Sequence, residues 1–277
     1  MEQIHDKRLL VFNCHEPWVY QMERTHLPMD IITDLPGRYK RGWDTNMRPL
    51  PKNCRLIDLA EAKASPLTYY CIITHNLTDL LDVRQRPEPR IYVIHSTLEG
   101  RAQKEKTSFQ PGQMKYLLRK YAGLTRTHVV SCSRLKGSSW GFTEDIVPFG
   151  ADPGDYHQFT GEKAAGLRIS NFISHRKEIL MWNLHCRAFE DVPVKLVGHN
   201  DDMNGVSASE DWNDLKHKLS IHRFYIHTAH PKLEDGYNMS TLEAMAAGMP
   251  VIGNRNPSSP IEHGISGFLS DSPEELN

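Results

Sequence analysis

Two successive series of short apolar segments, each alternating with helical stretches, constrain the fold of this 277-residue chain most strongly. The first series predicts a helix over 112–121 and strands at 9–12, 30–33, 71–74, 90–94 and 128–131. The second predicts helices at 178–189, 212–219 and 240–247, and strands at 167–173, 194–197, 224–227 and 250–252. Strands that alternate with helices are typical of a parallel sheet covered on both faces. The sequence therefore predicts an α/β protein with two Rossmann-like domains.

A stretch rich in Gly, Asp and Pro, residues 150–161, separates the two series. Such residues favour turns, so we expect two domains, 1–160 and 161–277, joined near 150–165. The segment 35–51 shows no periodicity and is expected to be a long surface loop. Residues 271–277 predict the first turn of a helix, with Pro273 at its first position. We therefore expect the C-terminal domain to be incomplete at its C-terminal end.

The composition excludes several classes of protein. Lys+Arg 33 against Asp+Glu 34 leave a net charge of −1, so no global field attracts nucleic acid. Five scattered cysteines favour neither a disulfide framework nor a zinc site, and the 15 histidines form no H-E-x-x-H pattern. We expect no metal, no cofactor and no nucleic-acid partner. Without a long apolar stretch or a signal peptide, the chain is predicted to be cytoplasmic.

The run from Asp235 to Ile252 carries the most chemical information. A loop that begins with Gly236 leads into a predicted helix at Ser240, whose first N–H groups lack internal partners and attract phosphate. The carboxylates of Asp235 and Glu243 can accept hydrogen bonds from a vicinal diol. Phosphate and diols together describe a nucleotide sugar. The alternative, which the spacing leaves open, is that Ser240 and Glu243 form only a capping box.

The run D-G-Y-N-M-S-T-L-E-A-M-A-A-G-M-P-V-I at 235–252 resembles the E-x7-E region of GT-B glycosyltransferases, particularly family 4, with Asp235 in place of the first Glu. Residues 259–269 resemble the P-E-I-V-x-x-G-x-x-G-x-L segment that follows in this family, and 147–152 resemble its I-P-N-G-V-D junction. The likeness spans roughly residues 90 to 270. The N-terminal region lacks it, because residues 13–17 read N-C-H-E-P where the family has a Gly-Gly loop.

The resemblance implies a GT-B fold, in which two domains face each other across a cleft. It also implies a metal-independent, retaining transferase of carbohydrate biosynthesis, which moves a sugar from a nucleotide-sugar donor to an acceptor hydroxyl. The acceptor would be a glycan, a lipid-linked molecule or a small molecule. Peripheral contact with the inner face of a membrane is compatible with this interpretation. The sequence names neither the sugar, the base nor the acceptor.

The resemblance also implies roles for single residues. His95 follows a predicted strand, as does the family histidine that points toward the transferred sugar; a histidine satisfied at a strand end is the alternative. Arg176 occupies the family's phosphate-binding Lys position, while Asn171 replaces the family's Arg; a solvated basic turn is the alternative. The expected catalytic residues are His95, Asp235 and Arg176, and the expected donor-binding residues are Lys177, Gly236, Tyr237, Asn238, Met239, Ser240 and Glu243.

Two other functions remain open from the sequence. A sugar-nucleotide hydrolase or epimerase of the same fold would use the same donor without transferring the sugar to an acceptor. A non-catalytic module would bind the sugar nucleotide without turnover, which the replacements at Asn171 and Asp235 make a real alternative.

Overall fold

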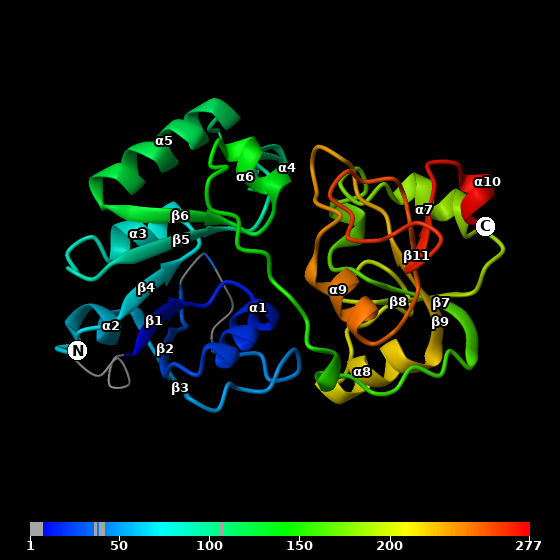
Figure 1. The fold of residues 1–277 in the computed structure, drawn as a ribbon, viewed down its shortest axis with the longest axis horizontal. Coiled ribbons are helices and arrows are strands. Elements are labelled where there is room, and N and C mark those ends of the chain that lie inside the picture. Colours follow the sequence, from blue (N-terminus) through cyan, green and yellow to red (C-terminus); the bar gives the residue numbers. More distant parts are fainter. Residues whose placement is uncertain (1–7, 36–37, 39–41, 106–107) are drawn as a thin grey trace. The chain divides into compact units, whose positions relative to one another are not determined.

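The computed structural model describes residues 8–35, 38, 42–105 and 108–277, and it divides into two compact units (Figure 1). Unit 1 extends to His95 and resumes after α4, as far as Pro148. Unit 2 comprises Phe149–Asn277 together with the segment that begins at Ser96 and carries α4 (Leu98–Glu105). The sequence places the boundary after residue 160, whereas unit 2 begins at Phe149 and also takes in α4. The predicted cleft between the domains stays a prediction.

Unit 1 is built on a six-stranded parallel sheet in the order β3-β2-β1-β4-β5-β6. The strands are β1 (Leu9–Phe12), β2 (Met29–Ile32), β3 (Cys54–Ile57), β4 (Cys71–Thr74), β5 (Arg90–Ile94) and β6 (Thr127–Ser131). Three of them, β1, β2 and β4, are buried along their whole length, as strands covered on both faces are. This order is that of a Rossmann fold, in which ligands bind where the chain order reverses, here between β1 and β4.

The helices of unit 1 are α1 (Glu16–Gln21), α2 (Leu59–Ala64), α3 (Leu77–Asp82), α5 (Pro111–Leu124) and α6 (Arg134–Trp140), with a 3-10 turn η2 (Met22–Thr25). Ala62 of α2 packs against Leu10, Phe12 and Ile32 on one face of the sheet. The helix expected at 112–121 is confirmed as α5. Residues 42–51 contain neither helix nor strand, as expected for a loop; 36–37 and 39–41 lie outside the described residues.

Unit 2 contains a five-stranded parallel sheet in the order β11-β10-β9-β7-β8, so that the chain order reverses between β7 and β9. Its strands are β7 (Lys163–Ile169), β8 (Val194–Val197), β9 (His222–His227), β10 (Val251–Gly253) and β11 (Gly267–Leu269). The expected strand 167–173 is wrong at both ends. It ends at Ile169 because Asn200 Nδ2 donates to the Ser170 carbonyl at 2.8 Å and Phe172 is left-handed, with φ 54°.

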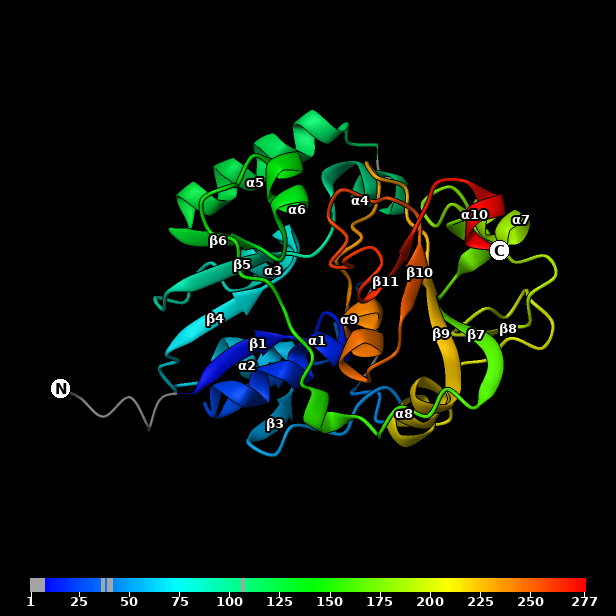
Figure 2. The same cartoon turned by 45° about the vertical axis from the view of Figure 1, so that its right-hand side comes forward.

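The helices of unit 2 cover both faces of this sheet. They are α7 (Trp182–Ala188), α8 (Trp212–Ile221), α9 (Met239–Ala246) and α10 (Pro273–Leu276), with the 3-10 turns η3 (Pro153–Asp155) and η4 (Ile173–His175). Phe189, after α7, and Leu276 of α10 pack with Ile226 on one face, and α7 and α10 lie side by side in Figures 1 and 2. Leu219 of α8 and Ala244 of α9 belong to the core of the other face.

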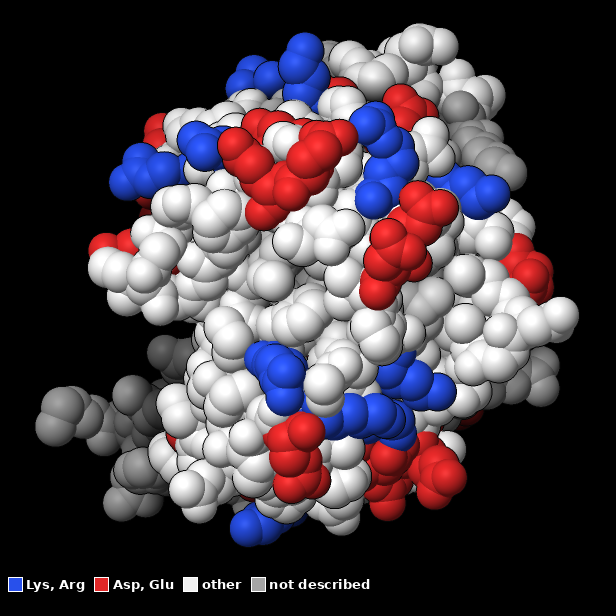
Figure 3. Space-filling model, turned by 90° about the vertical axis from the view of Figure 1, so that its right-hand side faces the viewer, with Lys and Arg blue, Asp and Glu red and all other residues white. Residues whose placement is uncertain are grey.

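The surface carries charges of both signs. On the face that Figure 3 shows, basic and acidic side chains alternate in small groups, as the net charge of −1 leads one to expect. Among the described residues, no helix combines the length and apolar character that crossing a membrane requires.

Candidate functional site

In unit 2, the candidate residues lie beyond the carboxyl ends of β7 and β9, the two strands between which the chain order reverses. β7 is followed by the turn that carries Asn171 and Arg176, and β9 is followed by the loop 228–238 that leads into α9. Ligands of parallel α/β sheets bind in the crevice at this position. The fold therefore brings together two sequence segments that were predicted separately to bind the donor.

Asp235 organises the loop that precedes α9. Its side chain is fully buried, and Oδ1 accepts hydrogen bonds from the Tyr237 N–H at 2.8 Å and from the Ser258 hydroxyl. The Gly236 N–H donates to Ser258 Oγ at 3.0 Å, and a Cβ at Gly236 would lie 2.9 Å from the Ser259 backbone. Asp235 and Ser258 thus fix the backbone of this loop. The catalytic role expected for Asp235 stays a prediction.

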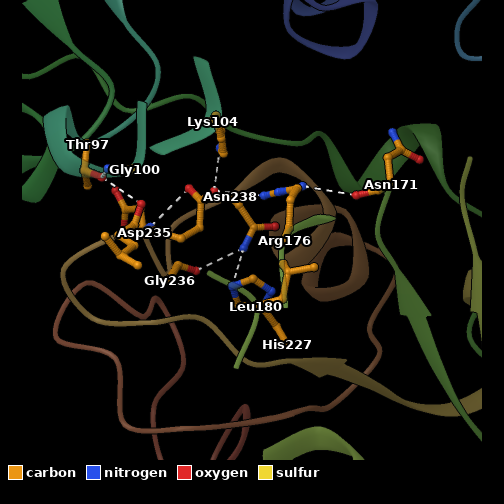
Figure 4. Close-up of polar contacts among 12 residues, drawn as sticks. Thr97, Gly100, Lys104, Asn171, Arg176, Leu180, His227, Asp235, Gly236 and Asn238 are labelled. Carbon is orange, nitrogen blue, oxygen red and sulfur yellow. Dashed lines mark hydrogen bonds and ion pairs between the residues drawn. The ribbon is translucent and has the colours of Figure 1, made fainter. Parts of the chain in front are cut away.

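Two cations meet one carboxylate beside the loop (Figure 4). Glu234 Oε2 lies 3.0 Å from Arg176 Nη2 and 2.9 Å from Lys104 Nζ. Arg176 also donates to the Asn171 carbonyl at 3.4 Å. Arg176 is thus held against the loop 233–238, while Lys177, next in the chain, is exposed.

Helix α4 contacts this loop from a distant part of the sequence. Thr97 Oγ1 donates to the Leu233 carbonyl at 2.7 Å and accepts from the Gly100 N–H at 3.1 Å. A Cβ at Gly100 would lie 1.9 Å from the Leu233 oxygen, so only glycine allows this close approach. Lys104 of the same helix reaches Glu234. These residues belong to no motif that the sequence predicts to bind the donor. The signal that could have found them is the glycine inside a short helix, which indicates a close backbone approach.

The start of α9 excludes one of the two interpretations of Glu243. Asn238 is the N-cap, because its side chain accepts from the Thr241 N–H at 3.0 Å, and the helix begins at Met239. The alternative interpretation, a capping box of Ser240 with Glu243, is therefore wrong. Glu243 lies in the second turn and is only 3% exposed. Among the described residues, no hydrogen bond uses the N–H groups of Met239 and Ser240, the first two of the helix.

Ser240 and Tyr237 are also held by the protein. The Ser240 side chain lies close enough to Tyr225, a buried residue of β9, to lower the pKa of its hydroxyl, while burial, the larger effect, raises that pKa to about 12. The Tyr237 hydroxyl donates to the Phe149 carbonyl at 2.5 Å, and the two rings lie 5.2 Å apart. Met239 is buried. The side chains of Tyr237 and Met239 thus contribute to the shape of the site.

His227, at the end of β9, was not singled out by the sequence. Its Nε2 lies 2.9 Å from Asn238 Nδ2. Burial, helped by the charge of Arg168, lowers the pKa of His227 to about 4, so the ring is neutral at pH 7. The amide of Asn238 can only donate through Nδ2, so Nε2 of His227 is the acceptor. This contact positions the cap of α9.

In unit 1, His95 lies beyond the carboxyl end of β5. Its Nε2 is 2.8 Å from Nδ1 of His75, which follows β4, and its Nδ1 is 3.6 Å from Sγ of Cys132, which follows β6. The ring of Trp18 in α1 meets both imidazoles edge-on, with centroids 5.0 Å apart. His95 is therefore well packed at its strand end. Its predicted role toward a transferred sugar stays a prediction.

No protein-family model matches this chain, and no curated protein matches it either. Several solved structures do. Anabaena HepE, determined in complex with UDP and glucose, is 13% identical, with 98% of this chain and 87% of HepE covered and a TM-score of 0.66. The apo form of the lipopolysaccharide outer core galactosyltransferase WaaB is 12% identical, with 98% and 87% covered and a TM-score of 0.56. TarM is 13% identical, with 75% of this chain and 45% of TarM covered and a TM-score of 0.54.

At these identities the likeness establishes the fold alone. Two parallel sheets, each covered by helices, match the two Rossmann-like domains of GT-B glycosyltransferases. The predicted fold class is thereby confirmed.

Proposed function

We propose that this chain is a glycosyltransferase that moves a sugar from a nucleotide-sugar donor to an acceptor hydroxyl, with retention of configuration. The observation that carries the proposal is the grouping of Arg176, Lys104, the start of α9 and Glu243 around one end of the unit 2 sheet. That end is where an α/β sheet binds nucleotides. The complex of HepE with UDP and glucose has the same fold and supports this class of donor.

The donor diphosphate would bind between the cations and α9. Arg176 and Lys104 share the carboxylate of Glu234. Both cations can bind an incoming anion, and the N–H groups of Met239 and Ser240 add the positive end of the helix dipole. A diphosphate could therefore replace Glu234 as partner of Arg176 and accept hydrogen bonds from the helix.

Glu243 would accept hydrogen bonds from the donor ribose. It projects from α9, and its carboxylate lies close enough to Tyr225 to influence the pKa of that residue. A carboxylate that is 3% exposed binds hydroxyl groups strongly, because water competes poorly for it. With the capping-box role excluded, ribose binding is the function we assign to Glu243.

Transfer of the sugar needs stabilisation of the leaving group above all. Cleavage of the bond between sugar and phosphate develops negative charge on the diphosphate, which Arg176, assisted by Lys104, would neutralise. The acceptor hydroxyl would attack on the face of the leaving group, and a donor phosphate oxygen would take its proton. This chemistry uses no metal at the diphosphate. His95 and Asp235 are proposed to act near the transferred sugar, and Lys177 and the loop 236–240 to bind the donor.

The biological setting remains part of the proposal. We expect a glycan, a lipid-linked molecule or a small molecule as acceptor, and a cytoplasmic protein that can work at the inner face of a membrane in carbohydrate biosynthesis.

The test is a panel of nucleotide sugars, in which thermal shift reads binding and nucleotide release reads turnover. Glu243→Gln should weaken donor binding by roughly 1–3 kcal/mol, as loss of a charged hydrogen-bond partner does. Glu274→Gln is the matched control, because Glu274 is 73% exposed and its ion pair with Arg187 is on the surface. Sugar released without an acceptor would favour the hydrolase, and binding without turnover would favour the non-catalytic module. If no nucleotide sugar binds, the proposal fails.

A further inference from the structure

Three potential metal ligands of unit 1 converge at the carboxyl end of its sheet. Cys14 follows β1, His75 follows β4 and His95 follows β5, three strands that are neighbours in the sheet. One ligand atom from each residue lies within 4.8 Å of the other two. Cys14 and His75 flank the point at which the chain order reverses, where a Rossmann sheet offers its ligand crevice.

The distances suit a small tetrahedral metal ion. Zinc bonds of about 2.0–2.1 Å to nitrogen and 2.3 Å to sulfur place two nitrogens about 3.3 Å apart, and nitrogen and sulfur about 3.6 Å apart. His95 Nε2 lies 2.8 Å from His75 Nδ1 and 3.8 Å from Cys14 Sγ. Separating the two rings by about half an ångström would bring the nitrogen–nitrogen distance to the zinc value, and the nitrogen–sulfur distance is already close to its own. The distance between Cys14 Sγ and the His75 ligand atom is within 4.8 Å.

The surroundings hold these ligands in place. The carboxylate of Asp79 accepts hydrogen bonds from the N–H groups of His75 and Asn76, both at 2.9 Å, and so fixes the turn after β4. The Trp18 ring contacts both imidazoles and restricts their rotation. In metal sites, such neighbouring groups orient the side chains that bind the metal.

We infer that Cys14, His75 and His95 form a binding site for a zinc-class divalent ion, with three protein ligands and one open coordination position. One thiolate and two imidazoles match the preference of zinc for sulfur and nitrogen, and three protein ligands leave the fourth position to water or another oxygen ligand. Cys132 lies on the opposite side of the His95 ring, beside Nδ1, so it is not one of the three ligands. The site shares His95 with the proposed transfer reaction, but metal binding by these three residues does not depend on that reaction.

The test uses the full chain, freed of metal with a chelator, reduced and titrated with Co²⁺. We expect one equivalent to bind, with the visible bands of tetrahedral cobalt and a thiolate-to-cobalt charge-transfer band, and Zn²⁺ should displace it. Cys14→Ser should abolish the charge-transfer band. His75→Ala should weaken binding by more than about 100-fold, beyond the 10–100-fold that loss of an outer-shell partner costs. Cys132→Ser, and Cys186→Ser at an exposed cysteine of unit 2, should keep the band.

A second measurement needs no variant. Zn²⁺ should protect Cys14 of the wild-type chain from alkylation while Cys186 stays reactive, which peptide mass spectrometry reads residue by residue. The absence of Co²⁺ bands and of protection would overturn the inference and leave His75 and His95 as a plain hydrogen-bonded pair. A charge-transfer band that survives Cys14→Ser and disappears in Cys132→Ser or Cys186→Ser would also overturn it. These readouts do not involve donor or acceptor, so failure of the transferase proposal would leave them unaffected.

Discussion

Replacement of Gly100 by Ala should separate α4 from the loop that carries Glu234 and Asp235. In most helices a Gly→Ala change is favourable by about 1 kcal/mol. At Gly100 the new Cβ would lie 1.9 Å from the Leu233 carbonyl oxygen and 3.0 Å from its carbon, so the helix or the loop must move. Backbone atoms form this obstacle, and no change of rotamer can relieve it.

The expected change in the free energy of unfolding of Gly100→Ala has three contributions. Overpacking costs about 1–3 kcal/mol and loss of the hydrogen bond from Thr97 to Leu233 about 0.5–1.5 kcal/mol, while helix propensity returns about 1 kcal/mol. We therefore expect a net destabilisation of about 0.5–3.5 kcal/mol. Gly123→Ala in α5 is the matched control, because a Cβ there meets nothing within 4 Å. That change should stabilise unit 1 by up to about 1 kcal/mol.

The assay is urea denaturation followed by hydrogen exchange and mass spectrometry, because two units need not unfold as one. Peptides from α4 and from 228–238 should exchange faster in Gly100→Ala, and donor binding should weaken as the pair of Lys104 with Glu234 is displaced. If Gly100→Ala proves as stabilising as Gly123→Ala and exchange is unchanged, the contact between α4 and the loop does not exist in solution.

Three further predictions concern the site and its support. Arg176→Ala should lower turnover by about 100-fold, the scale of one lost electrostatic donor, while Arg187→Ala, at a residue 70% exposed, should not; equal rates in steady-state assays would remove Arg176 from the mechanism. Asn238→Ala should cost about 1 kcal/mol of unfolding free energy through loss of the α9 cap, measured by thermal unfolding, and an unchanged melting temperature would contradict the cap. Burial lowers the pKa of His185 from the ordinary 6.5 to about 3 in the folded chain. Below pH 6.5 the unfolded chain therefore binds a proton that the folded chain excludes. The stability that the neutral His185 contributes is complete above pH 6.5 and is lost as pH falls toward 3. Melting curves of His185→Gln should depend less on pH in this window; identical slopes would refute the assignment.

Of the four strands whose bounds the sequence predicts, β1, β4 and β5 are largely buried, whereas β8 is a partly exposed edge strand. The expected strands 9–12, 71–74, 90–94 and 194–197 coincide with β1, β4, β5 and β8. Continuous β-branched and apolar runs identify the buried strands locally, because both faces must be apolar. The edge strand β3 was missed, since Arg55 and Leu56 are exposed and its pattern resembles that of a loop.

The start of α9 shows where local reasoning stops. Asn238 and Ser240 are both good N-caps by residue type, so the sequence could not choose between them. The structure chooses Asn238, because the turn at Asp235 and the contact with His227 hold it in the capping position. Because Asn238 is the N-cap, Ser240 and Glu243 do not form the capping box that their spacing suggested.

The sequence by itself determined two alternating α/β series and the position of Arg176 and the run 235–243 in the second series. Both could be predicted because hydrophobic periodicity and helix termini depend on residues that are close in the sequence. Only the tertiary structure brought Lys104 to Glu234 across 130 positions, and Cys14 to His95 across 81. In the unit 1 sheet, parallel strands place their carboxyl ends at one edge, which explains why Cys14 and His95 meet. The close contact of α4 with the Leu233 carbonyl places Lys104 beside Glu234. Both contacts join residues far apart in the sequence, so no local pattern could predict them.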